Sequence, residues 1–423
     1  MSKVVYNAMK LSVYRPLFHA LRVLIIGSGA VGSYLMEFFA KMGLSPDAID
    51  FDYFTLENAA KHSGIVHTPE DAGRNKAECT AERVQPLLDD GCSSNGIEGD
   101  LCKLGPEAFA DYAYVVVAVD NFDAKVLLNE LIRQLPEDRR PIVIMDGTYD
   151  EMAQSVMLDN TEFCLRCLMD ESWMKDSSIR TSCTGPQVRQ IDGVSEIVRT
   201  SNLASSMAAH LSAEQLRGHV IGAQHVMNRR LTYTAYPNLE LSVSHPMRKR
   251  NCPGCAVHPP KKIEWLHGNV LEVTLQDAMD QIASFLQTTD FEISVHRLNY
   301  KKIVHAGFIV DDVCHSCGQP IRVMQHEGRV FLDDLLCEAC AAQGKTARNS
   351  ADFSHGQILH AFTPDCDEAI RSMTLYALGF PLGAHIEVIC RNGALDFLDE
   401  GKVTKTIFAF DEDHAKMHQV HKL

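Results

Sequence analysis

A glycine-rich turn directly after a short apolar run constrains the fold of this chain more than any other feature. Leu21 to Ile26 is rich in branched residues, Gly-Ser-Gly-Ala-Val-Gly follows with glycines at Gly27, Gly29 and Gly32, and apolar residues then recur at helical spacing through Met42. A strand, a tight turn and a helix in this order open a β-α-β unit, in which backbone N–H groups at the helix N-terminus can approach phosphate. The pattern fits NAD, FAD and ATP equally well, so it predicts a nucleotide site without identifying the nucleotide.

Three further apolar runs extend this unit into a sheet. The segment 48–54 alternates and carries Asp50 and Asp52 about 20 residues after the glycines, where a ribose-binding acid is expected. The segment 112–119 is continuously apolar, as in a parallel strand covered on both faces, and it runs into Asp120. We expect another strand over 141–145, a turn over 146–148 and a helix over 123–135. The order predicts a doubly wound, Rossmann-like α/β domain.

A change in sequence pattern near residue 260 predicts a second domain. Pro259-Pro260-Lys261-Lys262 is a plausible boundary, which gives a nucleotide-binding domain over 1–259 and a smaller α+β domain over 260–423. In the second domain we expect a helix over 369–378, a strand over 385–390 and a hairpin within 320–331.

The cysteines indicate metal rather than disulfides. Of fourteen cysteines, eight form four Cys-x-x-Cys pairs, which in a reducing compartment favour thiolate ligands over disulfides. We predict two structural zinc ions per chain, the first in the Rossmann-like domain and the second in a zinc ribbon at 314–340 that includes the hairpin. A redox role for a single pair is the competing interpretation. The predicted ligands are Cys164, Cys167, Cys252 and Cys255 for the first site, and Cys314, Cys317, Cys337 and Cys340 for the second.

The charge and hydropathy of the chain exclude several classes of function. A net charge of −15, with one short basic run at 247–250, argues against a nucleic-acid binder, because phosphate neutralisation needs clustered Lys and Arg. An apolar stretch of about 20 residues, which a membrane span requires, does not occur, and the first residues lack the pattern of a signal peptide. We therefore expect a cytoplasmic protein.

Four short motifs resemble one adenylating family over roughly residues 20–258. The family has Asp-x-Asp at the end of its second strand, then Asn-Leu-x-Arg-Gln, then Gly-x-x-Lys and, after the next strand, Asp-Asn. The corresponding residues here are Asp50–Asp52, Asn58–His62, Gly73–Lys76 and Asp120–Asn121. The spacing of the two N-terminal Cys-x-x-Cys pairs is also similar. The chain thus resembles the ubiquitin-activating-enzyme-like family that includes ThiF, MoeB and HesA, and in particular bacterial activators of ubiquitin-like proteins.

This resemblance implies a role for each motif residue. Asp50, with Asp52 beside it, would hold the ribose of ATP; Asn58, Lys61 and Lys76 would face the phosphates; and Asp120 would hold Mg²⁺. Lys61 stands where the family has Arg, so a compact ammonium takes the place of a planar guanidinium that can donate two parallel hydrogen bonds. Taken singly, the two lysines are compatible with solvated surface residues, and Asp120 with a helix cap.

Cys183 resembles the position of the family's acyl-accepting cysteine. It lies in a polar stretch between the two halves of the first predicted zinc site, and its thiolate could carry the partner's C-terminal glycine as a thioester. A thiol without a catalytic role is the alternative. If Cys183 is the nucleophile, the catalytic residues are Cys183, Asp120, Lys76 and Lys61.

The predicted function is ATP-dependent adenylation of the C-terminal glycine of a ubiquitin-like protein, followed by thioester transfer through Cys183 to a conjugating enzyme. The pathway would be a bacterial ubiquitin-like protein conjugation, and it could be antiphage. The resemblance also implies a homodimer. The first alternative is activation of a sulfur-carrier protein for thiamine, molybdopterin or tRNA thiolation. An inactive zinc-ribbon adaptor and a nicotinamide-dependent oxidoreductase are the others.

Overall fold

The computed structural model divides into two compact units, one formed by Met1–Leu101, Phe109–Pro259 and Met417–Leu423 and the other by Cys102–Ala108 and Pro260–Lys416. The structure describes all residues except 1–14, 20, 59–61, 64–67, 121, 150–151, 162, 170–186, 192–193, 199–200, 224–225, 236–237, 301–302, 306, 328–329, 331, 346–355, 391–403 and 414–423. The division separates Pro259 from Pro260.

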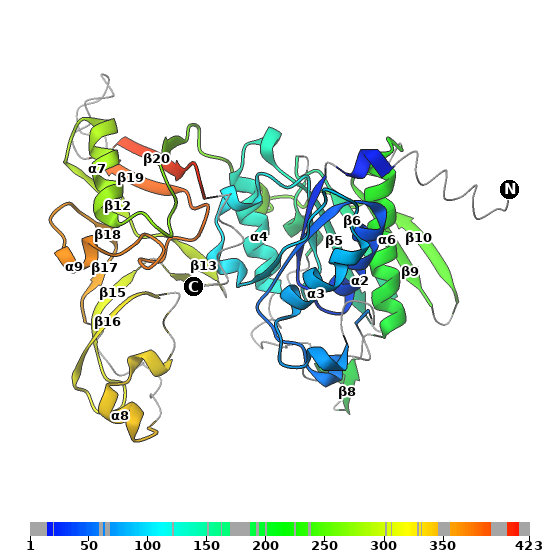
Figure 1. Ribbon diagram of the computed structural model, residues 1–423, viewed down its shortest axis with the longest axis horizontal. Coiled ribbons are helices and arrows are strands. Elements are labelled where there is room, and N and C mark those ends of the chain that lie inside the picture. Colours follow the sequence, from blue (N-terminus) through cyan, green and yellow to red (C-terminus); the bar gives the residue numbers. More distant parts are fainter. Residues whose placement is uncertain are drawn as a thin grey trace. The chain divides into compact units, whose positions relative to one another are not determined.

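The first unit is built on a mixed sheet with the strand order β10-β9-β6-β5-β4-β1-β2-β3 (Figure 1). Its parallel part comprises β1 (Arg22–Ile26), β2 (Ser45–Asp50), β3 (Gly96–Glu98), β4 (Tyr114–Val117) and β5 (Ile142–Tyr149). Its antiparallel part comprises β6 (Met152–Leu158), β9 (Arg229–Thr234) and β10 (Glu240–Ser244). A separate pair is formed by β7 (Gln187–Ile191) and β8 (Val194–Val198). The parallel part confirms the predicted Rossmann-like α/β sheet.

Helices of the first unit share one core with alternate strand residues. Residues of α2 (Ala30–Met42), α3 (Lys76–Val84) and α6 (Asn202–Val220) pack with residues such as Ile25, Val116 and Ile144 of the sheet. The intervening residues, including Leu24, Val115 and Val143, are also buried, as in a sheet covered on both faces. The remaining long helix, α4 (Phe122–Gln134), follows β4. In the part of the chain that is described, no helix combines the length and the apolar character that crossing a bilayer would require.

The helices begin and end at identifiable caps. The N–H of Ala204 donates to the Ser201 side chain at the start of α6, and α2 ends at Gly43, which has φ of 93° and donates its N–H to the carbonyls of Phe39 and Ala40. Short 3₁₀ helices connect the longer elements: η1 (Leu56–Asn58), η2 (Pro69–Asp71), η3 (Gln85–Leu87), η4 (Leu101–Lys103), η5 (Pro106–Phe109), η6 (Glu137–Arg139), η7 (Leu165–Leu168), η8 (Gly254–Ala256) and η10 (Leu332–Leu335).

Two predicted boundaries in the first unit are wrong. The strand predicted over 48–54 is β2, which ends at Asp50 because the Asp50 carboxylate accepts the N–H of Asp52 and turns the chain away. The turn predicted over 146–148 is part of β5, which continues to Tyr149 because β6 pairs with it residue by residue, with Asp146 opposite Ser155.

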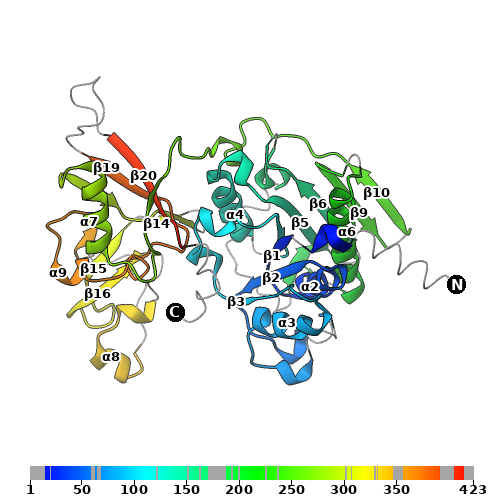
Figure 2. The same ribbon diagram turned by 45° about the horizontal axis from the view of Figure 1, so that its top comes forward.

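The second unit contains a five-stranded sheet with the order β11-β20-β19-β12-β18. Two neighbouring strands of this sheet, β19 and β20, are labelled in Figure 2. Its strands are β11 (Glu264–Leu266), β12 (Phe291–Ser294), β18 (Ala361–Phe362), β19 (Ile386–Cys390) and β20 (Thr404–Phe410). The strand predicted over 385–390 is thus confirmed. Helix α7 (Leu275–Leu286) begins with a capping box between Thr274 and Asp277 and places Phe285 edge-on against Phe408, with ring centroids 5.4 Å apart.

A smaller sheet in the second unit has the order β16-β15-β17. It comprises β15 (Phe308–Val313), β16 (Pro320–His326) and β17 (Ile358–Leu359), and the hairpin of β13 (Leu298–Tyr300) and β14 (Ile303–His305) precedes it. Two short helices, α8 (Glu338–Ala342) and α9 (Glu368–Arg371), complete the described elements of this unit.

Two predictions in the second unit are wrong. The hairpin expected within 320–331 is instead formed by β16 with the preceding β15, so the pair Cys314/Cys317 lies in the turn of that hairpin. The helix expected over 369–378 ends at Arg371, because the next residues pair with the segment before α7: the N–H groups of Leu375 and Tyr376 donate to the carbonyls of Val273 and Val270.

Candidate nucleotide and metal sites

The glycine turn lies at the carboxyl end of β1 and requires glycine at two positions. Gly27 has φ of 93°, and a Cβ on it would lie 2.8 Å from Val119 Cγ1; a Cβ on Gly32 would lie 1.9 Å from the Gly27 carbonyl oxygen. Gly29 is the N-cap of α2, and a Cβ added to it would have no other heavy atom within 4 Å. The first-turn N–H groups of α2 therefore adjoin an open surface, as a phosphate site requires.

Asp50 binds the glycine turn at the carboxyl end of β2. One carboxylate oxygen accepts the Ser28 N–H at 2.7 Å, and the other accepts the Asp52 N–H at 2.9 Å. Burial raises the pKa of Asp50 to about 6, although Lys76 and the two N–H donors oppose the shift. A carboxylate at this place can accept a hydrogen bond from a ribose hydroxyl.

Lys76 begins α3 with its side chain buried at 2% exposure. Its Nζ donates to Asp52 Oδ2 at 3.2 Å, and its backbone N–H donates to the Asp52 carbonyl at 3.0 Å. A buried ammonium is retained only where anions compensate the loss of water. Asp52 provides one such anion, and a phosphate nearby would provide another.

Asn75 joins the strand that carries the acids to the helix that carries Lys76, although sequence reasoning did not select it. Its Nδ2 donates to the carbonyls of Asp50 and Asp52 at 3.0 and 3.2 Å, and its Oδ1 accepts the N–H groups of Ala77 and Glu78 at 2.9 and 3.1 Å. The only sequence signal for Asn75 is its position as an Asn before a helix, which is typical of an N-cap.

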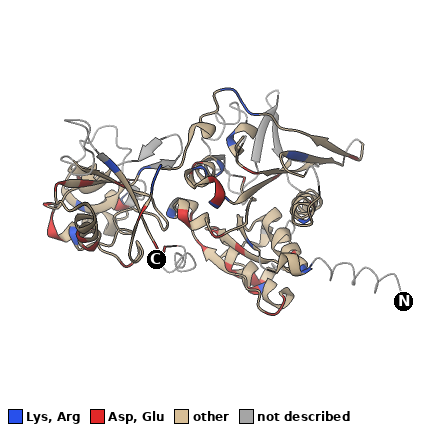
Figure 3. Cartoon of the chain, turned by 90° about the horizontal axis from the view of Figure 1, so that it is seen from above, with Lys and Arg blue, Asp and Glu red and all other residues tan. Residues whose placement is uncertain are grey.

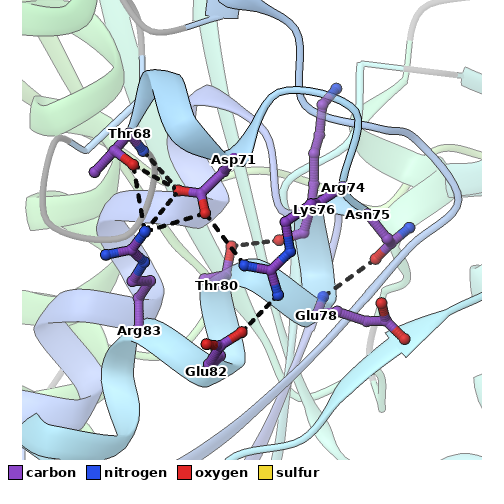
Figure 4. A network of polar contacts seen from close by, with 9 residues as sticks. All are labelled: Thr68, Asp71, Arg74, Asn75, Lys76, Glu78, Thr80, Glu82 and Arg83. Carbon is purple, nitrogen blue, oxygen red and sulfur yellow. Dashed lines mark hydrogen bonds and ion pairs between the residues drawn. The ribbon is translucent and has the colours of Figure 1, made fainter.

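A polar network supports the loop before Lys76 (Figure 4). The buried Asp71 carboxylate accepts hydrogen bonds from the N–H and hydroxyl of Thr68 and from Arg74 and Arg83. Arg74 also donates to Glu82 of α3 at 2.6 Å. These contacts fasten the loop to the helix, and the pKa of Asp71 is lowered because its hydrogen bonds outweigh the effect of burial.

The structure describes only one of the two other residues predicted to face phosphate, and it tests the phosphate contact of neither. Asn58 is buried at 2% exposure, and its Oδ1 accepts the Thr55 N–H at 3.0 Å, which closes the turn at η1. Lys61 lies outside the described residues. Its proposed contact with phosphate therefore stays a prediction.

Asp120 is exposed three residues after the end of β4. Since β1 lies between β4 and β2 in a parallel arrangement, Asp120 follows a strand at the same sheet edge as Gly27 and Asp50. Lys125 interacts electrostatically with Asp146 and Asp120, although its burial lowers the pKa of its ammonium. Burial raises the pKa of Asp146 to about 8.

Within the part of the chain that the structure describes, two groups of side chains could hold a metal ion, and both consist of the predicted cysteines. In the first group, Sγ atoms are separated by 3.8 Å for Cys164 and Cys252, 3.4 Å for Cys167 and Cys255 and 3.5 Å for Cys164 and Cys255. A tetrahedral zinc with Zn–S bonds of about 2.3 Å places its sulfurs about 3.8 Å apart. Burial, reinforced by neighbouring thiols, raises the pKa of Cys164, a cost that a bound cation would remove.

The second cysteine group also has a geometry suited to a metal. Cys317 and Cys337 have their Sγ atoms 3.7 Å apart, and the N–H of Cys337 donates to Cys314 Sγ at 3.2 Å. Cys314 and Cys340 are buried, whereas Cys317 is exposed. The donor set of each group, four sulfurs within 4.8 Å of one another, fits zinc.

Cys183 lies outside the described residues, so the structure does not place the predicted nucleophile. Acidic and basic residues are interspersed along the described part of the chain (Figure 3).

Comparison with known proteins gives relatives that match only part of the chain. A SAMP-activating enzyme E1 of Haloferax volcanii is 29% identical over 153 residues, which is 36% of this chain and 54% of that protein. A ubiquitin-activating enzyme E1 1 of Candida albicans is 31% identical over 121 residues, 26% of this chain and 12% of that protein. The chain therefore spans about half of the first relative and much less of the second.

Solved structures of similar chains include E. coli MccB with ATP, at 16% identity and a TM-score of 0.44, covering 58% of this chain and 69% of MccB. A structure of PaaA gives 15% identity and a TM-score of 0.41, covering 59% of this chain and 76% of PaaA.

The family comparison extends further along the chain than either relative. The model of the ThiF family matches residues 6–256, which is more than half of the chain and includes the glycine turn, both acids at the end of β2, Asp120 and the first cysteine group. The protein belongs to the ThiF family.

Proposed function

We propose that this protein uses ATP to adenylate the C-terminal carboxylate of a small partner protein that ends in glycine. The observation that carries the proposal is the meeting of the glycine turn, Asp50 and the Asp52–Lys76 pair at the sheet edge where Asp120 follows β4. The names of the two relatives, which describe activation of SAMP and of ubiquitin, support the choice of a protein substrate.

Each residue has a defined task in this reaction. Asp50 accepts a hydrogen bond from a ribose hydroxyl, the first-turn N–H groups of α2 donate to phosphate oxygens, and Lys76 offsets phosphate charge. Asp120 holds Mg²⁺, which when bound neutralises charge on the triphosphate. The partner's carboxylate then attacks the α-phosphate, and the bond to the β-phosphate breaks with release of pyrophosphate. This chemistry depends on positioning and charge compensation rather than on a strong base.

We assign zinc to both cysteine groups and a zinc ribbon to the second. Closed sites with four thiolates are structural, so neither zinc has a catalytic role. The first stabilises the Rossmann-like unit. The second, whose Cys317 is exposed, belongs to the unit that we expect to recruit the partner or a conjugating enzyme.

The next step of the proposed reaction depends on Cys183. In our proposal the Cys183 thiolate attacks the adenylate carbonyl, AMP leaves, and the partner is held as a thioester for a conjugating enzyme. Transfer of the adenylate to a sulfur donor is the alternative outcome, and a sulfur-carrier partner would then replace the ubiquitin-like one.

ATP–pyrophosphate exchange with the full-length protein tests the adenylation step. Candidate partners are small proteins that end in glycine, and the matched control is a partner without its last glycine. We expect exchange that depends on the intact partner and is lost in Asp120→Ala with the circular dichroism spectrum unchanged. Absence of exchange with every partner, together with tight NADH binding, would refute the proposal in favour of a nicotinamide enzyme.

A further inference from the structure

Three polar residues recur every four positions along α4, at Lys125, Asn129 and Arg133. Residues with this spacing lie on one face of a helix. Asn129 and Arg133 are buried at 2% and 6% exposure, and the same helix buries Leu128 and Ile132 in the apolar core. A buried polar face on a core helix needs partners outside the helix, because unpaired polar atoms are costly.

The second half of α4 binds both turns of the first cysteine group. Arg133 donates through Nη2 to the Cys255 carbonyl at 3.3 Å and through Nη1 to the Asn160 carbonyl. Asn129 Oδ1 accepts the N–H of Arg166, which lies between Cys164 and Cys167, at 3.4 Å. Arg133 thus contacts one cysteine pair and Asn129 the other.

Two further features show that α4 packs closely against the first cysteine group. The Arg166 guanidinium lies 3.7 Å from Glu130 of α4. Gly254, between Cys252 and Cys255, has no room for a side chain, since a Cβ there would lie 2.7 Å from Asn129 Nδ2 and 3.0 Å from Cys164 Sγ. The helix and the cysteine group are therefore packed as one body.

The first turn of α4 adjoins the proposed magnesium residue. Asp120 lies two residues before the helix begins. Burial lowers the pKa of Lys125 in the first turn, and the charges of Asp146 and Asp120 oppose that shift. From Lys125 to Arg133 the helix rises about 12 Å, at about 1.5 Å per residue. A single rigid helix thus reaches from the cysteine group to the loop that carries Asp120.

We propose that Asn129 and Arg133 are positioning residues, through which the metal-loaded cysteine group fixes α4 and so holds Asp120 in place for Mg²⁺ and ATP. The inference rests on the proposed function and deepens it, since it gives the first cysteine group a role in nucleotide binding beyond stability. A shift of about 1 Å at a site of this kind can cost about a hundredfold in rate, so modest loosening of α4 would be measurable.

The test compares two buried arginines near the same helix end. Arg133→Met removes hydrogen bonds to the carbonyls of Cys255 and Asn160. Arg140→Met also removes a bond to the Asn160 carbonyl, together with those to Leu135 and Arg133, but none to a cysteine turn. Arg133→Lys keeps one donor group. Two quantities are measured on full-length protein: the rate of zinc release to a chromogenic chelator, and the Mg²⁺ concentration for half-maximal ATP binding by calorimetry.

We expect Arg133→Met to release zinc about tenfold faster than the parent protein, as loss of a group that orients metal ligands does elsewhere. It should also need several times more Mg²⁺, with Arg133→Lys intermediate and Arg140→Met close to the parent in both measurements. Equal effects of Arg133→Met and Arg140→Met would overturn the inference, as would faster zinc release with an unchanged Mg²⁺ requirement. If the parent protein bound no ATP at all, the proposed function and this inference would fall together.

Discussion

Removing the side chain of Asn75 should destabilise the first unit and weaken ATP binding together. This residue is buried at 2% exposure and forms four hydrogen bonds, two to the carbonyls of Asp50 and Asp52 and two from the first turn of α3. No other side chain in the described site contacts both the strand that carries the acids and the helix that carries Lys76 through such a set of bonds. Asn75→Ala removes all four.

The expected loss of stability follows from these contacts. An N-cap contributes about 1 kcal/mol, and each of the two amide bonds to a carbonyl contributes about 1 kcal/mol. The Asp50 and Asp52 carbonyls keep other donors, the N–H groups of Gly99 and Lys76, so they are not left unsatisfied. We therefore expect Asn75→Ala to cost about 2–3 kcal/mol. Asn75→Ser, which retains a cap but not the amide, should cost about 1–2 kcal/mol.

Thermal unfolding and ATP titration measure the two consequences. For a unit of this size about 1 kcal/mol lowers the Tm by about 2–4 °C, so Asn75→Ala should melt about 4–12 °C lower. Gln85→Ala, which removes one amide bond to the Ser94 carbonyl and no cap, is the control. A Tm of Asn75→Ala equal to that of Gln85→Ala, or unchanged ATP affinity in a folded Asn75→Ala protein, would refute the reasoning.

Three further outcomes are expected. Burial raises the pKa of Asp50 to about 6, and an ionised carboxylate accepts a hydrogen bond from a ribose hydroxyl more strongly than the protonated acid does. ATP affinity should therefore fall by up to about tenfold from pH 7 to pH 5, and titration of Asp50→Asn should show whether this slope disappears. Elemental analysis should give about two zinc ions per chain, decreasing to about one in a Cys314→Ser, Cys317→Ser double variant; a value of about one in the parent protein would remove one assignment. Cys183→Ala should keep pyrophosphate exchange but form no adduct that reductant cleaves on gels; persistence of the adduct would place the nucleophile elsewhere.

The parts of the site that the sequence predicted are those encoded by local pattern. The glycine turn, the acids at the end of β2 and the cysteine pairs each occupy a few consecutive residues whose spacing follows from backbone geometry. The same logic predicted β1, β4 and α4 to within a few residues. It failed at β5, where pairing with a later strand, rather than any local preference, extends the strand through Asp146.

Local sequence patterns did not predict the contacts between segments that are distant in the chain. Nothing near Arg133 in the sequence indicates that its partners are the carbonyls of Asn160 and Cys255, and the hairpin around Cys314 depends on β15, which precedes the cysteines rather than separating them. Asn58 matches a family motif, and the motif did not indicate that its Oδ1 closes the turn at η1; its predicted contact with phosphate stays a prediction.

The buried charges of this unit separate residues that bind from residues that position. Lys76 and Asp52 pair with each other at 3.2 Å at the sheet edge of the proposed nucleotide site, so their charges can act on a ligand. Arg133 is also buried, but it donates hydrogen bonds to neutral carbonyls on two loops, and a guanidinium used in this way fixes geometry instead of neutralising an anion. The two kinds of cation lie in one unit, Lys76 at the start of α3 and Arg133 near the end of α4. It follows that a variant at Lys76 should change ATP affinity without changing zinc release, whereas a variant at Arg133 should change both.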